Sequence, residues 1–325
     1  MIVSIIHRAV MQGIPLLYGS TGEIITEKGG HLNLGIPGIM YVGAISGVIG
    51  AFLYEQKADA FNPVLAVLIP LLCSILGSFL MGLLYCVLTV TLHANQNVTG
   101  LAMTTFGVGF GNFFGGSLIN LTDSDTPSIA LVETSRIFKT TLPFADNLGK
   151  IGELFFSYSF LAYTAIIIAV IASVFLNKTR KGLHLRAVGE SPATADAAGI
   201  NVEKYKYVST CIGSVIAGLG GLYYVMDYAD GIWSNDAFGD RGWLAIALVI
   251  FAMWKPSLSI LGSILFGGLL IVYNYIPNLS FEHQELLKMA PYIVTILVLV
   301  IISMRRKKEN QPPASLGLSY FREER

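Results

Sequence analysis

Long apolar stretches alternate with short polar segments along this chain of 325 residues. A helix needs about 20 predominantly apolar residues to cross a bilayer, and most of these stretches approach that length. The bilayer core offers the backbone no hydrogen-bond partners, so such stretches are expected to be α-helices. The pattern predicts an all-α, polytopic membrane protein with about nine or ten transmembrane helices. The nine expected spans cover residues 3–22, 39–54, 63–92, 101–116, 154–176, 208–226, 242–253, 258–273 and 292–304.

Composition agrees with the membrane class. The chain is 54% hydrophobic and 13% charged, with a mean hydropathy of +0.64, whereas a soluble domain carries about 25% charged residues. The formal net charge is zero, so electrostatics do not favour a nucleic-acid partner. Cys73, Cys86 and Cys211 lie in apolar stretches and form no C-x-x-C pair, which indicates packing residues rather than a metal site or a disulfide.

Charge along the polar segments predicts the topology. Basic residues gather in the loop 178–206 and at the start of the tail 305–325, and such loops stay in the cytoplasm. The loops 120–150 and 227–241 lack this basic excess and are expected outside. We therefore expect a multi-pass cell-membrane protein with one transmembrane domain, residues 1–304, and a cytoplasmic C-terminus.

The loop 178–206 contains a short helix signal. Ser191 is a good N-cap, and Pro192 suits the first helical position. Alanines follow, and Gly199 is a natural stop. The pattern predicts a helix of about two turns over residues 192–198. An ordinary cytoplasmic turn is the alternative that composition alone leaves open.

The segment LRAVGESPATADAAGI within this loop resembles the cytoplasmic coupling loop of permeases in ABC importers. Those permeases belong to the branched-chain amino acid, ribose and nucleoside superfamily, whose loops read L-R-A-x-G-x-N/S-P-x-A-A-x-x-A-G-I. Ala195 and Ala198, spaced i and i+3, are expected to share a face that enters a groove on the ATPase. The residues that the resemblance assigns to this coupling are Arg186, Gly189, Glu190, Pro192, Ala195, Ala198 and Gly199.

The stretch from Gly22 to Ala44 is similar to a run in nucleoside-type permeases, S-E-R-x-G-V-x-N-I-G-x-E-G-M-M. Pro37 stands where many of those permeases carry an acidic residue, so any role for a carboxylate there is absent from this chain. Pro37 also prevents an unkinked helix through the whole stretch. A broken helix at membrane depth requires protein or a watery cavity around it.

That break makes Glu27 and Asn33 candidates for the substrate pathway. Asn97 and Thr99 join them because they open a glycine-rich span that resembles the family's polar-residue-T-G-L start. The structural alternative places Glu27 at the membrane surface and has Asn33 bond a neighbouring helix.

A third resemblance covers residues 239–267, where relatives read G-x-G-F-x-A-I-A-V-A-L-x-G-x-W-x-P. Trp254 carries part of that match, and simple membrane physics favours an interfacial anchor for it. The three stretches together most resemble the shorter of the two permeases in nucleoside-type uptake systems.

The resemblance implies a machine with several subunits. The sequence has no G-x-x-x-x-G-K-[ST] motif for ATP and no H-E-x-x-H or G-x-S-x-G motif for catalysis. No enzyme, metal site or bound cofactor is expected in this chain. The implied partners are an ATPase that binds ATP and Mg²⁺, a second homologous permease, an extracellular solute-binding lipoprotein and membrane lipid.

Two alternatives remain at this stage. The first keeps the same machine but moves a ribose-like sugar. The second is an ion-coupled secondary carrier, which would need carboxylates buried within its spans. Acidic residues here lie mostly in loops, apart from Glu23 and Glu27, which argues against the carrier.

Overall fold

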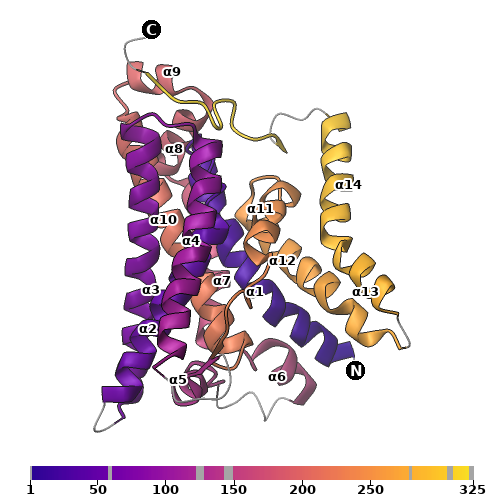
Figure 1. Ribbon diagram of the computed structural model, residues 1–325. Coiled ribbons are helices and arrows are strands. Elements are labelled where there is room, and N and C mark those ends of the chain that lie inside the picture. Colours follow the sequence, from indigo (N-terminus) through magenta and orange to yellow (C-terminus); the bar gives the residue numbers. More distant parts are fainter. Residues whose placement is uncertain are drawn as a thin grey trace.

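The computed structural model describes residues 2–57, 61–121, 128–142, 149–277, 280–305 and 310–321 (Figure 1). The mostly helical fold is confirmed, and the strands in the described part are the two-residue β1 (Ile129–Ala130) and β2 (Ile232–Trp233). The α-helices are α1 (Ile2–Glu27), α2 (Ile36–Lys57), α3 (Pro63–Cys86), α4 (Gln96–Ile119), α5 (Val132–Phe138), α6 (Gly149–Phe155), α7 (Phe160–Lys178), α8 (Arg180–Glu190), α9 (Pro192–Ala197), α10 (Val202–Tyr223), α11 (Arg241–Phe251), α12 (Pro256–Ile271), α13 (Phe281–Lys288) and α14 (Ala290–Arg305).

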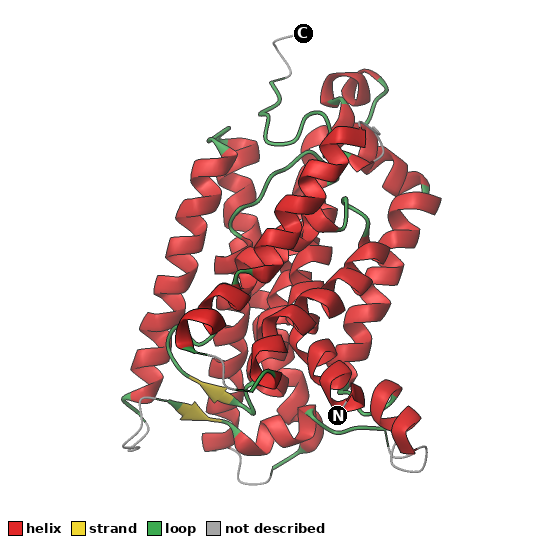
Figure 2. Ribbon diagram, turned by 90° about the vertical axis from the view of Figure 1, so that its right-hand side faces the viewer, coloured by secondary structure: helices red, strands yellow, loops and turns green. Residues whose placement is uncertain are grey.

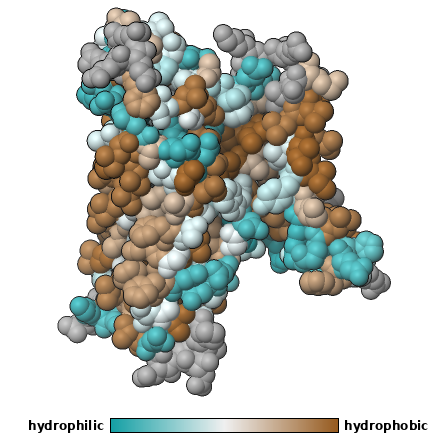
Figure 3. Space-filling model, turned by 45° about the horizontal axis from the view of Figure 1, so that its top comes forward, coloured by the Kyte–Doolittle hydropathy of each residue, from teal (hydrophilic) through white to brown (hydrophobic). Residues whose placement is uncertain are grey.

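Two long helices form the centre of the bundle. α1 packs along α10 and α12, while α2 packs along α3, α4 and α10. Their facing side chains build the main apolar core, which includes Tyr18, Ile39 and Leu222. Figure 3 shows apolar side chains over the flanks of the molecule and polar ones toward its ends. Large apolar surfaces of this kind indicate contact with a membrane.

Glycines set the spacing of the central helices. A β-carbon added at Gly22 of α1 would collide with the carbonyl oxygen of Gly213 on α10, and the reverse substitution would collide with Gly22. Helices in membranes gain stability by such close approach, because lipid supplies no hydrophobic drive between them.

Fewer of the described helical segments have the length and apolarity of a membrane span than the sequence suggested. All nine expected spans overlap helices, but only six helical segments in the described residues are long and apolar enough to cross a membrane. α11 has 11 residues, and α1, although 26 residues long, carries Arg8 and two glutamates. The count of nine or ten is therefore not confirmed. The six segments are Ile36–Lys57, Pro63–Thr91, Phe160–Lys178, Val202–Tyr228, Pro256–Tyr275 and Phe281–Ile301.

The chain breaks between α1 and α2, as Pro37 predicted. Residues 28–35 form a non-helical connection, and Pro37 is the second residue of α2, where its missing N–H is harmless. This connection of eight residues is too short to form a tenth span between the first two expected ones. Most of its residues are buried, so protein surrounds the backbone groups that have no helical hydrogen bonds.

The two ends of the bundle differ. α8 and α9 lie at one end, and α5 and α6 lie at the other together with the N-terminus (Figure 1). β1 pairs with β2 in antiparallel register at this second end, where Figure 2 shows the two strands. The segments 120–150 and 227–241, both expected outside, therefore meet at one end. Residues 122–127 and 143–148, and the basic residues 306–308, lie outside the described part.

Two charged residues expected in polar loops are instead buried. Asp227, at the start of the expected outer loop 227–241, lies in a π-helical turn (Tyr224–Tyr228) and is 2% exposed. Lys206, assigned to the basic loop, is 4% exposed on α10. The helical segment formed by α10 and the π-helical turn thus extends beyond both ends of the expected span 208–226.

Candidate coupling and gating site

α9 is the short helix that the sequence predicts. The Ser191 hydroxyl accepts a hydrogen bond from the backbone N–H of Thr194 at 3.4 Å, and Pro192 takes the first helical position. Gly199 follows with φ of +80°, the left-handed conformation that ends many helices. The predicted start is confirmed, and the helix ends at Ala197, one residue earlier than expected.

The predicted docking face of α9 needs correction. Ala195 is 3% exposed and packs against Val188 of α8 and Val202 of α10. Its side chain therefore faces the protein's own helices, so the expectation that Ala195 and Ala198 share an open face is wrong. The open surface of α9 and its C-terminal end is formed by Ala193, Thr194, Ala197 and Ala198.

α8, which the sequence patterns did not predict, connects α9 to the broken stretch. Thr179 caps α8 by accepting a hydrogen bond from the N–H of Gly182 at 3.0 Å. At the other end, a β-carbon on Gly189 would collide with the carbonyl oxygen of Lys28. Only glycine permits this approach. The coupling loop and the α1–α2 connection, noticed separately in the sequence, are thus in direct contact.

Glu27 ends α1 and is 3% exposed. Its carboxylate accepts a hydrogen bond from the indole N–H of Trp254, which lies in the turn between α11 and α12. Trp254 is only 7% exposed, so its indole packs inside the protein and does not face lipid, as the interfacial anchor expected for it would. The third family-like stretch therefore joins the second one through this bond.

A second carboxylate lies one helical turn before Glu27. Glu23 is fully buried, and its Oε1 accepts a hydrogen bond from the backbone N–H of Asn33 at 3.0 Å. Asn33 is also fully buried, and its Oδ1 accepts from the N–H of Gly35 at 2.9 Å. Its Nδ2 has no hydrogen-bond partner in the described part of the chain. A buried amide donor without a partner is rare and suits a group that meets water or a solute.

Two further buried polar residues went unnoticed in the sequence. The ring nitrogens of His31 lie 2.8 Å from the hydroxyl oxygens of Thr210 and Thr89. Gln96 accepts a hydrogen bond from the N–H of Leu32 at 2.8 Å. In the sequence, His31 is marked only by the glycine pair that precedes it. A single polar residue has no spacing pattern from which its hydrogen-bond partners could be predicted.

The remaining predicted residues occupy different surroundings. Asn97 is exposed on the first turn of α4, whereas Thr99 is 8% exposed. The end of the bundle that contains α8 and α9 is called the coupling end below. Arg186 and Glu190 line a hollow of about 410 Å³ at this end. Lys28, Trp254 and Lys255 also line it, so it lies against the Glu27–Trp254 bond and carries three cations and one carboxylate.

The C-terminal tail lies across this same end (Figure 1). The backbone N–H of Ser315 donates to the carbonyl oxygen of Gly189 at 3.0 Å, and Gln96 donates to the carbonyl of Leu318 at 3.3 Å. The Tyr320 hydroxyl donates to the carboxylate of Asp196 on α9 at 2.8 Å. Residues 310–321 are therefore folded against α8, α9 and α4 rather than forming a free tail.

Three carboxylates, those of Glu23, Glu27 and Asp227, are buried in helices. The sequence argument against an ion-coupled carrier rested on the scarcity of such groups and does not hold. Within the described residues, no three His, Cys, Asp or Glu side chains gather in a way that could hold a metal ion. The choice between carrier and ABC permease therefore depends on kinship.

Comparison with known proteins decides it. The family model described as "Branched-chain amino acid transport system / permease component" matches residues 5–302. The nucleoside ABC transporter permease protein NupC of Lactococcus lactis subsp. cremoris is 32% identical over 91% of each chain. The guanosine ABC transporter permease protein NupQ of Bacillus subtilis is 30% identical over 91% of this chain and 90% of its own.

A third relative points to another cargo. The relative is TsgC13 of Haloferax volcanii, which is named a "Putative glucose ABC transporter permease protein". It is 28% identical over 98% of each chain. No solved structure matches the chain. The resemblance noted in the sequence is confirmed: this chain belongs to the family of branched-chain amino acid transport system permease components.

Proposed function

We propose that the protein is the transmembrane subunit of an ABC importer that carries nucleosides into the cell. The observation that carries this proposal is similarity to NupC and NupQ over about nine-tenths of each chain. Relatives of this kind are transport subunits and not enzymes. The buried Asn33 amide and the carboxylates near it offer the hydrogen-bonding groups that a nucleoside requires.

A simple sugar is the second candidate cargo, and TsgC13 supports it. A sugar and a nucleoside share hydroxyl groups that the same buried polar residues could bind. The fold and the coupling end would serve either solute, so the two candidates differ in cargo and not in mechanism.

The contacts support a route from the ATPase to the pathway. The partner ATPase, which binds ATP and Mg²⁺, would contact the open surface of α9 around Ala198. α9 packs on α8, and Gly189 of α8 touches the connection that holds Asn33. Trp254 extends this route to α11 and α12 through Glu27. Such a packed series of contacts can transmit a movement if its members have two arrangements.

The same proposal sets the partners and the sidedness. α8, α9 and the C-terminal tail would face the cytoplasm, because basic residues are concentrated there. The opposite end, with β1 and β2, would face a solute-binding lipoprotein. A second homologous permease would complete the pathway at the cell membrane.

Uptake by intact cells tests the cargo. Cells lacking this protein should lose uptake of radiolabelled nucleoside at low concentration and regain it with the wild-type gene. Ribose and glucose uptake should not change. If sugar uptake falls and nucleoside uptake does not, the sugar proposal replaces the nucleoside proposal.

A further inference from the structure

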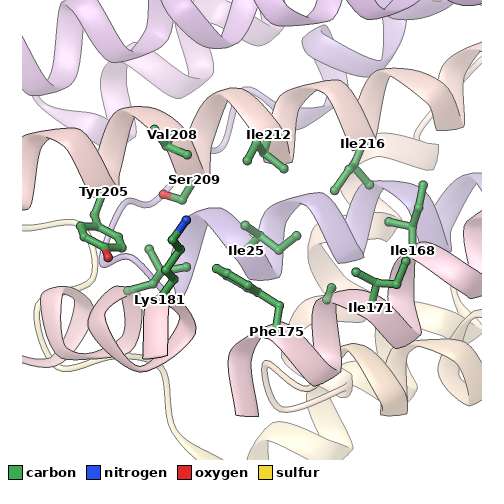
Figure 4. Close-up of a pocket in the computed structure, with 12 residues that line it drawn as sticks. Ile25, Ile168, Ile171, Phe175, Lys181, Tyr205, Val208, Ser209, Ile212 and Ile216 are labelled. Carbon is green, nitrogen blue, oxygen red and sulfur yellow. The ribbon is translucent and has the colours of Figure 1, made fainter. Parts of the chain in front are cut away.

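A deep apolar groove runs between two candidate spans, α7 and α10, and its floor is formed by α1 (Figure 4). The groove has a volume of about 490 Å³. Ile171 is 60% exposed, Val208 48% and Ile212 49%, so the groove opens on the flank of the helices. Its apolar lining is formed by Ile25, Ile168, Ile171, Ala172, Phe175, Leu185, Val208, Ile212 and Ile216.

One end of the groove is polar. Figure 4 shows Tyr205 and Lys181 at that end and Ile168 and Ile216 at the other. The amine of Lys181 points across the groove toward Ser209 on α10. Lys181 forms no ion pair with any residue that the structure describes.

The charges around this end are mostly positive. Lys178 at the end of α7, Arg180 at the start of α8 and Lys204 in the first turn of α10 are all exposed. Glu203 is the exposed carboxylate of the same turn. Lys181 is the cation that lines the groove, and in the helix ends that adjoin its polar end three further exposed cations stand against one anion, a surplus that favours an anionic ligand.

The ligand must combine an apolar body with an anionic head at this depth. The groove walls belong to spans, so the surrounding solvent is lipid, and the basic end is the one assigned to the cytoplasmic side. The cytoplasmic leaflet carries anionic phospholipids, and basic pockets between helices on that side bind their headgroups. An extended peptide would leave backbone groups unpaired in this apolar groove, whereas an acyl chain has none.

We propose that this groove is a binding site for one anionic phospholipid. One acyl chain lies between α7 and α10 over Ile25, and the phosphate headgroup contacts Lys181 near Tyr205. The lipid would then support α8 at its first turn, at the end opposite the Gly189 contact. The proposal goes beyond cargo and holds for a nucleoside or a sugar permease alike.

Lipid retention tests the proposal. The purified protein is reconstituted in vesicles with equal amounts of phosphatidylglycerol and phosphatidylcholine of identical acyl chains, then extracted, and the retained lipids are counted by mass spectrometry. Wild type should retain phosphatidylglycerol over phosphatidylcholine by about fivefold, the ratio equivalent to the ~1 kcal/mol that one Lys contributes near an anionic surface.

Matched variants separate the two parts of the site. Lys181→Gln should remove the preference, whereas Lys150→Gln, an exposed lysine on α6 at the opposite end, should keep it. Ile212→Trp should fill the groove and abolish retention of both lipids. Ile296→Trp, at a position 60% exposed on α14, should behave as wild type. If Ile212→Trp does not fold, Ile171→Trp is used as the groove-filling variant.

Three results would overturn the proposal. The first is equal retention of both lipids by wild type, and the second is unchanged retention in a folded groove-filling variant. The third is efficient cross-linking of a cysteine at position 212 to a second permease in intact membranes, which would make the groove a protein interface. None of these results affects the proposed ABC permease function, because uptake is measured separately.

Discussion

The indole N–H of Trp254 donates to the carboxylate of Glu27, and this bond joins the end of α1 to the turn between α11 and α12. Both residues are almost fully buried. The bond ties together two stretches that lie more than two hundred residues apart in the sequence. The bond lies beside the hollow at the coupling end. Residues of α8 and Trp254 line that hollow together, so a movement of α8 would change the surroundings of the bond.

Trp254→Phe is expected to weaken both stability and transport. The change leaves a buried carboxylate short of a donor, which costs about 1–3 kcal/mol. Thermal unfolding in detergent and uptake in cells are the measurements. Trp243→Phe, at a partly exposed position on α11, provides the control for loss of an indole. Equal unfolding temperatures for the two variants would show that the Glu27–Trp254 bond does not stabilise the fold.

Tyr320→Phe is expected to release the C-terminal tail from α9. The lost hydroxyl bond to Asp196 contributes roughly 1 kcal/mol, so local opening should increase about fivefold. The measurement is the rate at which a cysteine at Leu316 reacts with a thiol reagent, in a background without the three native cysteines. Tyr54→Phe, which removes a hydroxyl bond at α2, should leave that rate unchanged. A tail that is equally reactive in all variants would not be held by this contact.

Acid should destabilise the protein through His31, in the connection between α1 and α2. Burial, helped by the charge of Lys206, lowers the pKa of His31 to about 3. Unfolded histidine has a pKa near ~6.5, so below that pH the unfolded chain binds a proton that the folded protein excludes. The contribution of neutral His31 to the free energy of unfolding is therefore fully present above the unfolded pKa. It is lost as the pH falls toward 3, by up to about 1.4 kcal/mol per pH unit.

Unfolding temperatures measured at pH 7.5 and 5 test this. His31→Gln should be less stable than wild type at pH 7.5, but it should lose less stability on acidification. His283→Gln removes an exposed histidine and should retain the wild-type pH dependence. The same pH dependence in His31→Gln as in wild type would refute the role of His31.

Single cysteines test the topology. In a cysteine-free background, Thr179→Cys at the start of α8 should be protected from an impermeant thiol reagent in intact cells. Ser234→Cys, next to β2 at the opposite end, should be labelled. The reverse pattern would invert the protein in the membrane and place α9 outside, beyond reach of any cytoplasmic ATPase.

Local chemistry explains which features were predictable from sequence. Ser191, Pro192 and Gly199 each act within a few residues, so the start and stop of α9 could be read directly. Pro37 likewise marks the break before α2. The resemblance found the segments that meet at the coupling end, although it did not show that they meet.

Long-range packing explains the errors. Ala195 looked available because small residues suit docking, but the same property lets it pack against Val188 and Val202. Trp254 looked like an anchor because tryptophan favours membrane interfaces, yet its N–H has a buried acceptor 227 residues away. No periodicity or spacing in one sequence identifies such partners, since they depend on how the helices assemble.

We expect the open surface of α9 to transmit ATPase action to the permease. Ala198→Trp adds a large side chain to that surface without entering the Ala195 contact. Ala130→Trp makes the same change at an exposed position of β1, at the opposite end. Both variants should reach the membrane in normal amounts and unfold at the wild-type temperature.

The most direct measurement is copurification of the ATPase with each variant, followed by ATP-driven uptake of radiolabelled nucleoside in vesicles that contain the complex. We expect Ala198→Trp to lose both the bound ATPase and the uptake, while Ala130→Trp retains the ATPase. Normal ATPase binding and uptake by Ala198→Trp would show that the ATPase does not act through this surface.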